Sequence, residues 1–182
     1  MNRFKSIAVA FVLMLAAPLT HAIPIRWTLD GVVFNDGTVA SGAFTFDASS
    51  VSYSDLLIST LGATELTYTV DDLAPVFFGV GRNGVEMIDG FIPNDNLGKN
   101  ILNFRFAGAL TDAGGRLDLV DSFPSFQGRC TRADCTFASV DRQVIRGSVR
   151  GTPINEPAIP ALLMIGFSLI AFMRPPTARS SG

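Results

Sequence analysis

Histidine and lysine are almost absent from this 182-residue chain. The only histidine is His21, and Lys99 is the only lysine after residue 22. A Ser-His-Asp or Cys-His catalytic arrangement therefore cannot be assembled from residues 23 onwards, and a His-ligated zinc or iron site cannot either. Lys99 lies among turn residues, so we expect a solvated loop side chain.

Basic residues of any kind are scarce in the middle of the chain. Residues 23–152 contain nine Arg and one Lys against fifteen Asp and Glu, which gives a net charge of −5. Proteins that bind nucleic acid display a basic surface. The moderately acidic middle region therefore excludes nucleic acid as a partner.

Glutamate is also rare, since Glu65 and Glu86 are the only two in residues 23–152. Glycoside hydrolysis needs two carboxylates at a suitable separation. Glu65 falls on the polar phase of an alternating segment and Glu86 follows the Asn83-Gly84 turn, so we expect both to face solvent. The sequence predicts that the chain is not an enzyme.

No cofactor or metal is predicted, although a structural calcium ion is an alternative, because hard oxygen ligands are present. None of them follows the spacing of an EF-hand loop. They are Asp71, Asp72, Asp89, Asn94, Asp95 and Asn96.

Cys130 and Cys135 are the only cysteines in the chain. A metal site would need two further soft ligands that the sequence does not contain. In an oxidising compartment, two cysteines this close most simply form a disulfide that closes a small loop. We expect this disulfide to hold a hairpin that precedes a final strand over residues 144–149.

Residues 1–22 have the order of a secretory signal peptide. Arg3 and Lys5 precede an apolar stretch over residues 7–17, and Pro18 breaks that stretch shortly before Ala22. Eleven apolar residues are too few for a stable span. We expect export and cleavage by signal peptidase between Ala22 and Ile23, and an uncleaved anchor is the alternative.

A second apolar run covers residues 158–173 and is followed by Arg174 and Arg179. As a helix it would be about 24 Å long, whereas a bilayer core of about 30 Å needs about 20 residues. The sequence therefore predicts one short hydrophobic helix with a basic end over residues 174–182. A marginal span of this kind suits a temporary membrane anchor, with the basic end on the cytoplasmic side.

Apolar and polar residues alternate with a period of two throughout residues 23–152, as in half-buried antiparallel strands. Turn-forming clusters separate these segments, and no sustained helical period occurs. We predict one all-β domain over residues 23–152, an antiparallel β-sandwich or jelly roll, with a flattened barrel as the alternative. The apolar phases are Ile25/Trp27/Leu29, Leu66/Tyr68/Val70, Leu102/Phe104/Phe106, Leu117/Leu119 and Ile145/Gly147/Val149.

Phenylalanine is abundant, and most of it falls on the apolar phase of these segments, as does the single Trp27. We expect these rings to pack between the sheets. Two aromatic groups break the alternation, namely Phe77-Phe78 and Phe123 with Phe126. They are the candidates for exposed aromatic side chains.

The last thirty residues resemble a known sorting signal. The order Pro153-Ile-Asn-Glu-Pro-Ala158, apolar run, arginine is similar to the PEP-CTERM signal of exported proteins of Gram-negative bacteria, with motif 153–158 within the segment 153–182. Glu156 and Pro157 match the last two motif positions, whereas Asn155 replaces the first proline. Arg174 stands for the basic end, where the family usually has an arginine cluster.

The resemblance extends weakly to residues 27–54 and 145–149, which look like the first and last strands of ectodomains that carry this signal. It implies that an exosortase cuts near Asn155, Glu156 and Pro157, after transient anchoring in the inner membrane. It also implies a cell-surface or extracellular-matrix protein with a structural or adhesive role among exopolysaccharides. A carbohydrate-binding module and a permanently anchored bitopic protein are the alternatives.

Extended chain around the motif fits this implied role. Pro153, Pro157 and Pro160 disfavour helix, so residues 154–158 should be accessible to a protease. The partners expected are the Sec export machinery, signal peptidase, exosortase and exopolysaccharide.

Overall fold

The structure is a computed structural model that describes residues 23–62, 65–76 and 79–154. Within these residues the chain forms nine β-strands and one 3₁₀ turn, and no α-helix. The elements are β1 (Ile25–Phe34), β2 (Val39–Asp47), β3 (Ser52–Leu61), β4 (Leu66–Thr69), η1 (Val70–Asp72), β5 (Gly84–Ile88), β6 (Asn100–Arg105), β7 (Gly115–Asp118), β8 (Phe126–Cys130) and β9 (Ala138–Pro153).

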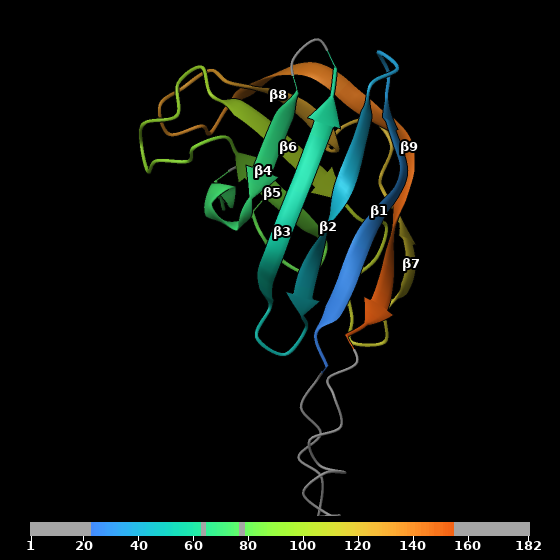
Figure 1. The fold of residues 1–182 in the computed structure, drawn as a ribbon. Coiled ribbons are helices and arrows are strands. Elements are labelled where there is room, and N and C mark those ends of the chain that lie inside the picture. Colours follow the sequence, from blue (N-terminus) through green and yellow to red (C-terminus); the bar gives the residue numbers. More distant parts are fainter. Residues whose placement is uncertain (1–22, 63–64, 77–78, 155–182) are drawn as a thin grey trace, which may run out of the picture.

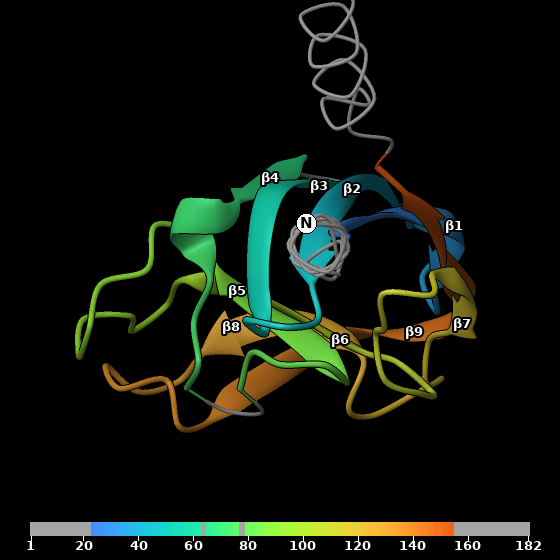
Figure 2. The same ribbon diagram turned by 90° about the horizontal axis from the view of Figure 1, so that it is seen from below.

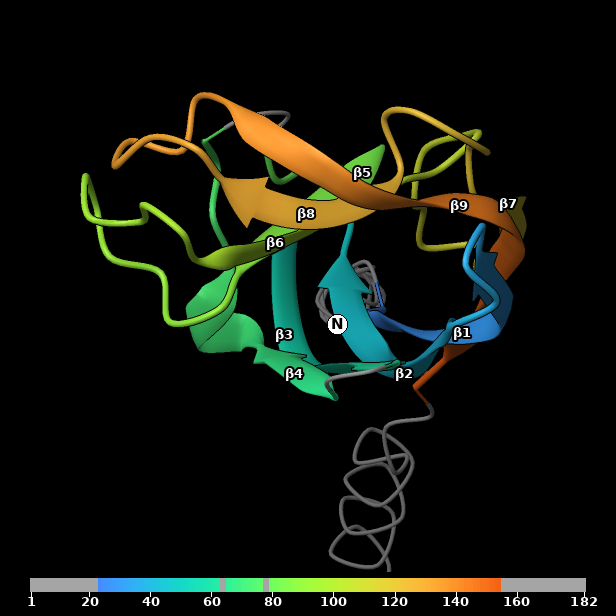
Figure 3. The ribbon, with the colours of Figure 1, turned by 90° about the horizontal axis from the view of Figure 1, so that it is seen from above.

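All strand pairs are antiparallel, and the strands form one sheet in the order β4-β3-β2-β1-β9-β8-β6-β5. β7 also pairs with β9, beside the half of β9 that β8 leaves free. The sheet folds over on itself, so that β1–β4 face β5, β6 and β8 as two layers (Figures 2 and 3). The all-β, antiparallel prediction is confirmed.

The sheet nearly closes into a barrel at its two ends. Residues that directly follow β4 reach β5, where Leu73 forms an antiparallel bridge with Met87. The backbone N–H of Ala74 also donates to the carbonyl of Glu86 at 2.9 Å. Two layers and a single continuous sheet therefore enclose one core.

Strand alternation fills the barrel interior with large apolar side chains. Ile25, Trp27 and Leu29 are buried, as their sequence phase predicts, and Leu102, Phe104 and Phe106 belong to the same core. The interior of one half is rich in rings, since the centroid of Tyr53 lies 5.2 Å from Phe44 and 4.9 Å from Phe46. Such pairs stabilise the core beyond the area that they bury.

A second, smaller core lies on the outer face of β5, β6 and β8. Loops cover this face, so alternate strand positions that the pattern assigned to water are buried as well. Asn103 is one of them, and its expected exposure is wrong for this reason. The buried members of this outer core are Ala74, Ile88, Ile101, Phe126, Cys130 and Cys135.

β9 is longer than expected and contains an irregularity that shifts its phase. Phe34 of β1 is opposite Val144, but Val33 is opposite Arg146, so one extra residue of β9 lies between them. Ile145 is that residue, and it is exposed. Its predicted burial is therefore wrong, because a bulge reverses the side-chain direction that strict alternation would give.

The described chain begins and ends at the same end of the barrel (Figure 1). Ile25 is opposite Pro153 in the β1–β9 pair, and the N–H of Ile154 donates to the carbonyl of Pro24 at 3.3 Å. The turn between β1 and β2, over residues 35–38, lies at the opposite end, which we call the barrel mouth. Gly37 adopts the left-handed conformation that this turn requires (φ 84°).

Candidate functional site

A pocket of about 220 Å³ opens at the barrel mouth. Figure 3 views this end of the molecule, with β8 and β9 on one side and the β1–β2 turn on the other. Side chains from five parts of the chain meet here. The lining residues are Asp36, Leu66, Asn100, Gln127, Arg129, Asp141 and Arg142.

The inner wall of the pocket is polar rather than apolar. The Gln127 side chain donates from Nε2 to Tyr68 Oη at 3.2 Å, and its Oε1 accepts from Arg142 Nε at 2.9 Å. Arg142 Nη1 in turn donates to Thr38 Oγ1 at 2.7 Å and to Asp36 Oδ2 at 3.2 Å. We call Tyr68, Gln127, Arg142, Thr38 and Asp36 the mouth network.

Three of the five side chains in this network are largely shielded from solvent. Tyr68 and Gln127 are buried, and only 11% of the Arg142 side chain is exposed. The Arg142 guanidinium carbon also lies 4.8 Å from the centre of the Phe34 ring, which is a cation–π contact. Burial raises the pKa of Tyr68 well above its usual value, so the phenol stays protonated.

Two local features of β8 and β9 place the charged groups at the rim. Gln127 and Arg129 share one face of β8 because side chains alternate, and that face points into the barrel. The register between β8 and β9 shifts after Gln127, which leaves Asp141 as the extra residue of a bulge. Gly128 permits the close approach, since a Cβ there would lie 1.7 Å from the carbonyl oxygen of Ser139.

The charges of the pocket are paired. Arg142 pairs with Asp36 at 3.2 Å, and Arg129 pairs with Asp141 at 3.7 Å. Desolvation raises the pKa of Asp36, but hydrogen bonds from Thr38 and Arg142 outweigh it, and the net shift is downward. The lining therefore combines two cations, two anions and two side-chain amides with no net charge.

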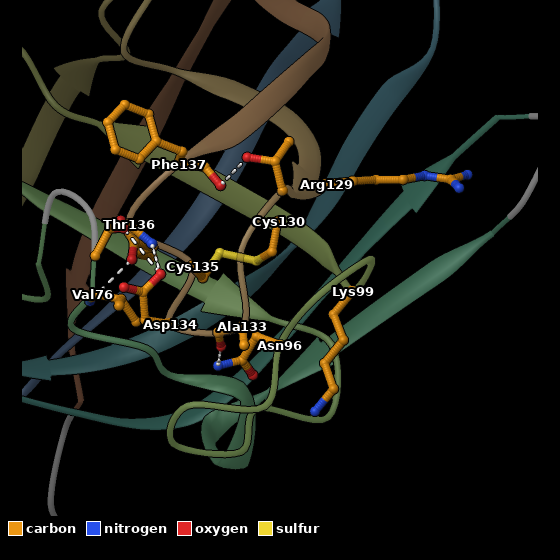
Figure 4. The surroundings of a disulfide bond; sticks show 12 residues. Val76, Asn96, Lys99, Arg129, Cys130, Ala133, Asp134, Cys135, Thr136 and Phe137 are labelled. Atoms are coloured by element: carbon orange, nitrogen blue, oxygen red, sulfur yellow. Dashed lines mark hydrogen bonds between the residues drawn. A yellow bond between two sulfur atoms is a disulfide. The ribbon is translucent and has the colours of Figure 1, made fainter.

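The Cys130–Cys135 disulfide lies directly beside this site and confirms the predicted bond. In Figure 4 the Cys130 side chain turns to one side of β8 and the neighbouring Arg129 side chain to the other. Asn96 anchors the disulfide loop, because its backbone N–H donates to the carbonyl of Ala133 at 2.8 Å. The disulfide thus holds the loop over the outer core while Arg129 reaches the pocket.

The two candidate carboxylates differ in their surroundings. Glu65 is exposed, as expected, but the expectation of solvent exposure for Glu86 is wrong. Glu86 is fully buried on the outer face of β5 and accepts a hydrogen bond from the N–H of Val76 at 3.1 Å. Sequence alternation could not show that loop residues cover that face.

Two of the residues considered as calcium ligands, Asp72 and Asn96, instead accept hydrogen bonds from backbone N–H groups. Asp72 is buried and accepts from the N–H groups of Thr69 at 2.7 Å and Gly90 at 2.8 Å. Asn96 Oδ1 accepts from the N–H of Ile92 at 3.0 Å. Across residues 23–62, 65–76 and 79–154, no group of three or more His, Cys, Asp or Glu residues is arranged to hold a metal ion.

Of the aromatic residues expected to be exposed, one is exposed and one is buried. Phe123 is 52% exposed, but Phe126 is buried, so its expected exposure is wrong. The two rings stack with centroids 5.7 Å apart, and Phe126 belongs to the outer core. Phe77 and Phe78 lie outside the described residues.

The residues of the predicted processing sites also lie outside the described part of the chain, with one exception. Ala22, Asn155, Glu156, Pro157 and Arg174 are not described, whereas Ile23 is described and is exposed. No helix among the described residues is long and apolar enough to span a bilayer.

A second hollow, of about 350 Å³, lies beside the irregular part of β9. Three charged side chains line it: Arg116, which pairs with Asp118, Asp30, which pairs with Arg150, and Arg146. The Arg116 side chain is 61% exposed, in contrast to the 11% of Arg142. The barrel mouth is therefore the better-organised site.

Sequence reasoning did not find the mouth network. Gln127 and Tyr68 are 59 residues apart, and neither belongs to a motif. The one available signal was a Gln and an Arg at strand positions that face inward. Comparison with protein-family models, with curated proteins and with solved structures finds no match for this chain.

Proposed function

We propose that this chain is a non-enzymatic exported protein whose sandwich-like ectodomain is sorted through residues 153–182 to the cell surface or extracellular matrix. Its role there is structural or adhesive. We propose further that the chain is exported through the Sec machinery and cleaved after Ala22. An exosortase then processes it near Asn155, Glu156 and Pro157.

The observation that carries the proposal is the position of the chain ends. Ile25 and Pro153 are paired in adjacent strands, so the predicted signal peptide and the predicted anchor join the domain at the same end. One membrane can therefore hold both segments without passing chain around the barrel. The mouth at the opposite end faces away from that membrane.

Two further features support it. The Cys130–Cys135 disulfide suits an oxidising compartment, because cytosolic thiols are kept reduced. The burial of Glu86 places one of the only two glutamates of the domain out of reach of a substrate. Carboxylate chemistry by Glu65 and Glu86 is therefore not part of the proposal.

Substitution of the motif tests the sorting step. The double variant Glu156→Ala/Pro157→Ala should accumulate in the inner membrane of the native host, because the processing enzyme would no longer recognise the segment. Glu65→Ala removes an exposed glutamate elsewhere and should fractionate as the wild type does. If the motif variant also reaches the surface and medium unchanged, sorting through this motif is wrong.

The barrel-mouth pocket favours a second candidate function, a carbohydrate-binding module of the cell surface. Mouths of β-barrels are frequent ligand sites, and polar side chains held in place by neighbours are what gives such sites their specificity. This function is compatible with the first, since an adhesive ectodomain must contact a matrix polymer.

A further inference from the structure

We infer that the barrel mouth binds one neutral, hydroxyl-rich sugar residue of a surface polysaccharide. This inference rests on the proposed function for its setting and names the ligand of the ectodomain. It is carried by the pocket and the mouth network.

The first step is the cost of the mouth network. Gln127 and most of Arg142 are buried, so both side chains lose their hydration when the protein folds. Apolar side chains at the same positions would not carry this desolvation cost. The opposite half of the same interior is filled with Phe44, Phe46 and Tyr53, so apolar filling of this barrel is feasible. The polar side chains at the mouth are therefore explained by a ligand that they contact, and not by the packing of the core.

The second step is the charge of the ligand. The pocket contains Arg129 and Arg142 against Asp36 and Asp141, each cation paired with one anion. A phosphate, sulfate or uronate ligand would have to compete with these carboxylates, and a cation would have to compete with the arginines. A neutral ligand disturbs neither pair.

The third step is the chemistry of recognition. Asn100 contributes an amide, which both donates and accepts, and Gln127 contributes its second Nε2–H, since its oxygen accepts from Arg142 and its other N–H donates to Tyr68. The ion pairs add fixed donors beside fixed acceptors. A hydroxyl group donates one hydrogen bond and accepts two. Adjacent hydroxyls of a sugar match this mixture, whereas Leu66 alone offers too little apolar surface for a lipid or an apolar peptide side chain.

The fourth step is size and direction. The pocket of about 220 Å³ is smaller than the roughly 300–1,000 Å³ of pockets for drug-sized ligands, so one sugar ring is the matching unit. The mouth lies at the end of the barrel remote from Ile25 and Pro153 (Figure 1). A polymer outside the membrane can therefore reach it.

Titration with defined sugars tests the inference. The protein isolated from its native host is titrated with the methyl glycosides of glucose, galactose and mannose, and separately with sodium glucuronate and sodium sulfate. At least one neutral glycoside should bind with a Kd on the order of 1 mM, and the anions should not. Binding of the anions alone, or of no neutral glycoside, would overturn the inference.

A matched pair of variants locates the site. Asn100→Ala/Arg129→Ala should weaken binding about tenfold or more, because hydrogen bonds to the ligand are lost. Arg150→Ala is the control: Arg150 is also paired with one aspartate, and its side chain is 60% exposed, close to the 65% of Arg129. This variant should bind as the wild type does. Equal binding by all three proteins would place the sugar elsewhere and refute the site.

The fractionation of these variants keeps this test separate from the proposed function. Both variants should reach the same compartments as the wild type, since neither changes residues 153–182. Correct sorting without sugar binding refutes only the inference. Sugar binding by a chain that stays unprocessed in the inner membrane refutes only the sorting proposal.

Discussion

The two halves of the barrel interior differ in the side chains that bridge the two layers. Toward the end where the chain begins and ends, Phe44, Phe46 and Tyr53 pack ring against ring. At the mouth, the same space between the layers is crossed by hydrogen bonds from Gln127 and Arg142.

The two ends therefore contribute to different properties, the aromatic end to stability and the mouth to the chemistry of the surface. A buried phenylalanine contributes about 1.5–3 kcal/mol relative to an exposed one, whereas a hydrogen bond contributes about 0.5–1.5 kcal/mol net. The aromatic half should therefore set the free energy of unfolding, and the mouth network should set what the molecule presents to its surroundings. Substitutions at the two ends should differ accordingly.

The largest effect is expected at the aromatic half. Phe46→Ala should lower the free energy of unfolding by about 3–5 kcal/mol, because Phe46 is fully buried and the cavity can collapse only partly. Urea unfolding monitored by circular dichroism measures this loss. Ile145→Ala, at an exposed apolar position of β9, should change it by less than about 0.5 kcal/mol. Similar losses in both variants would contradict the assignment of the core.

The next effect concerns the disulfide that lies beside the mouth. Cys130→Ser/Cys135→Ser should cost about 2 kcal/mol, because the bond closes a short loop and both cysteines belong to the outer core. The same unfolding experiment, with and without a reductant, measures it. The wild type should lose stability on reduction, and the double variant should not respond. A response of the variant would mean that the reductant acts elsewhere.

A smaller effect is expected when the mouth network is interrupted. Gln127→Leu should lower the free energy of unfolding by about 1–2 kcal/mol, because Arg142 and Tyr68 lose a buried partner. Gln127→Glu keeps an acceptor for Arg142 and should lose less. If the leucine variant is the more stable of the two, the hydrogen bonds of Gln127 do not stabilise the mouth.

The smallest effect concerns Asp36 and its pH dependence. The pKa of Asp36 lies below its usual value of 3.8, so its ionised form stabilises the fold above about pH 4, and this contribution is lost as the pH falls through the lowered pKa. Its side chain is 45% exposed, so solvent screening keeps the contribution below about 1 kcal/mol. Compared with the wild type, Asp36→Asn should therefore be slightly less stable at pH 7 and equally stable in acid. If the two proteins differ in free energy of unfolding by the same amount at pH 7 and in acid, the ion pair does not stabilise the fold.

Strand alternation predicted the positions that face one core and failed where a second layer covers the other face. Ile25, Trp27 and Leu29 are buried as expected, because one face of β1 packs inside the barrel. Glu86 and Phe126 are buried because loops close over the outside of β5 and β8. A pattern of period two carries no information about such coverage.

The site was less predictable than the fold for a related reason. Residues of the mouth network come from β4, β8, β9 and the β1–β2 turn, and only the strand order brings them together. The spacing of Cys130 and Cys135, in contrast, is local, and the bond that it predicted is present. Local chemistry is readable from the chain, whereas a site assembled by topology requires the structure.

The intact mass of the protein from its native host tests the central proposal most directly, with surface, medium and membrane fractions kept apart. We expect a chain that starts at Ile23 and ends between Asn155 and Ala158, found at the surface or in the medium. A chain that continues through Gly182 and stays in the membrane fraction would make it a permanently anchored protein and would contradict sorting by an exosortase.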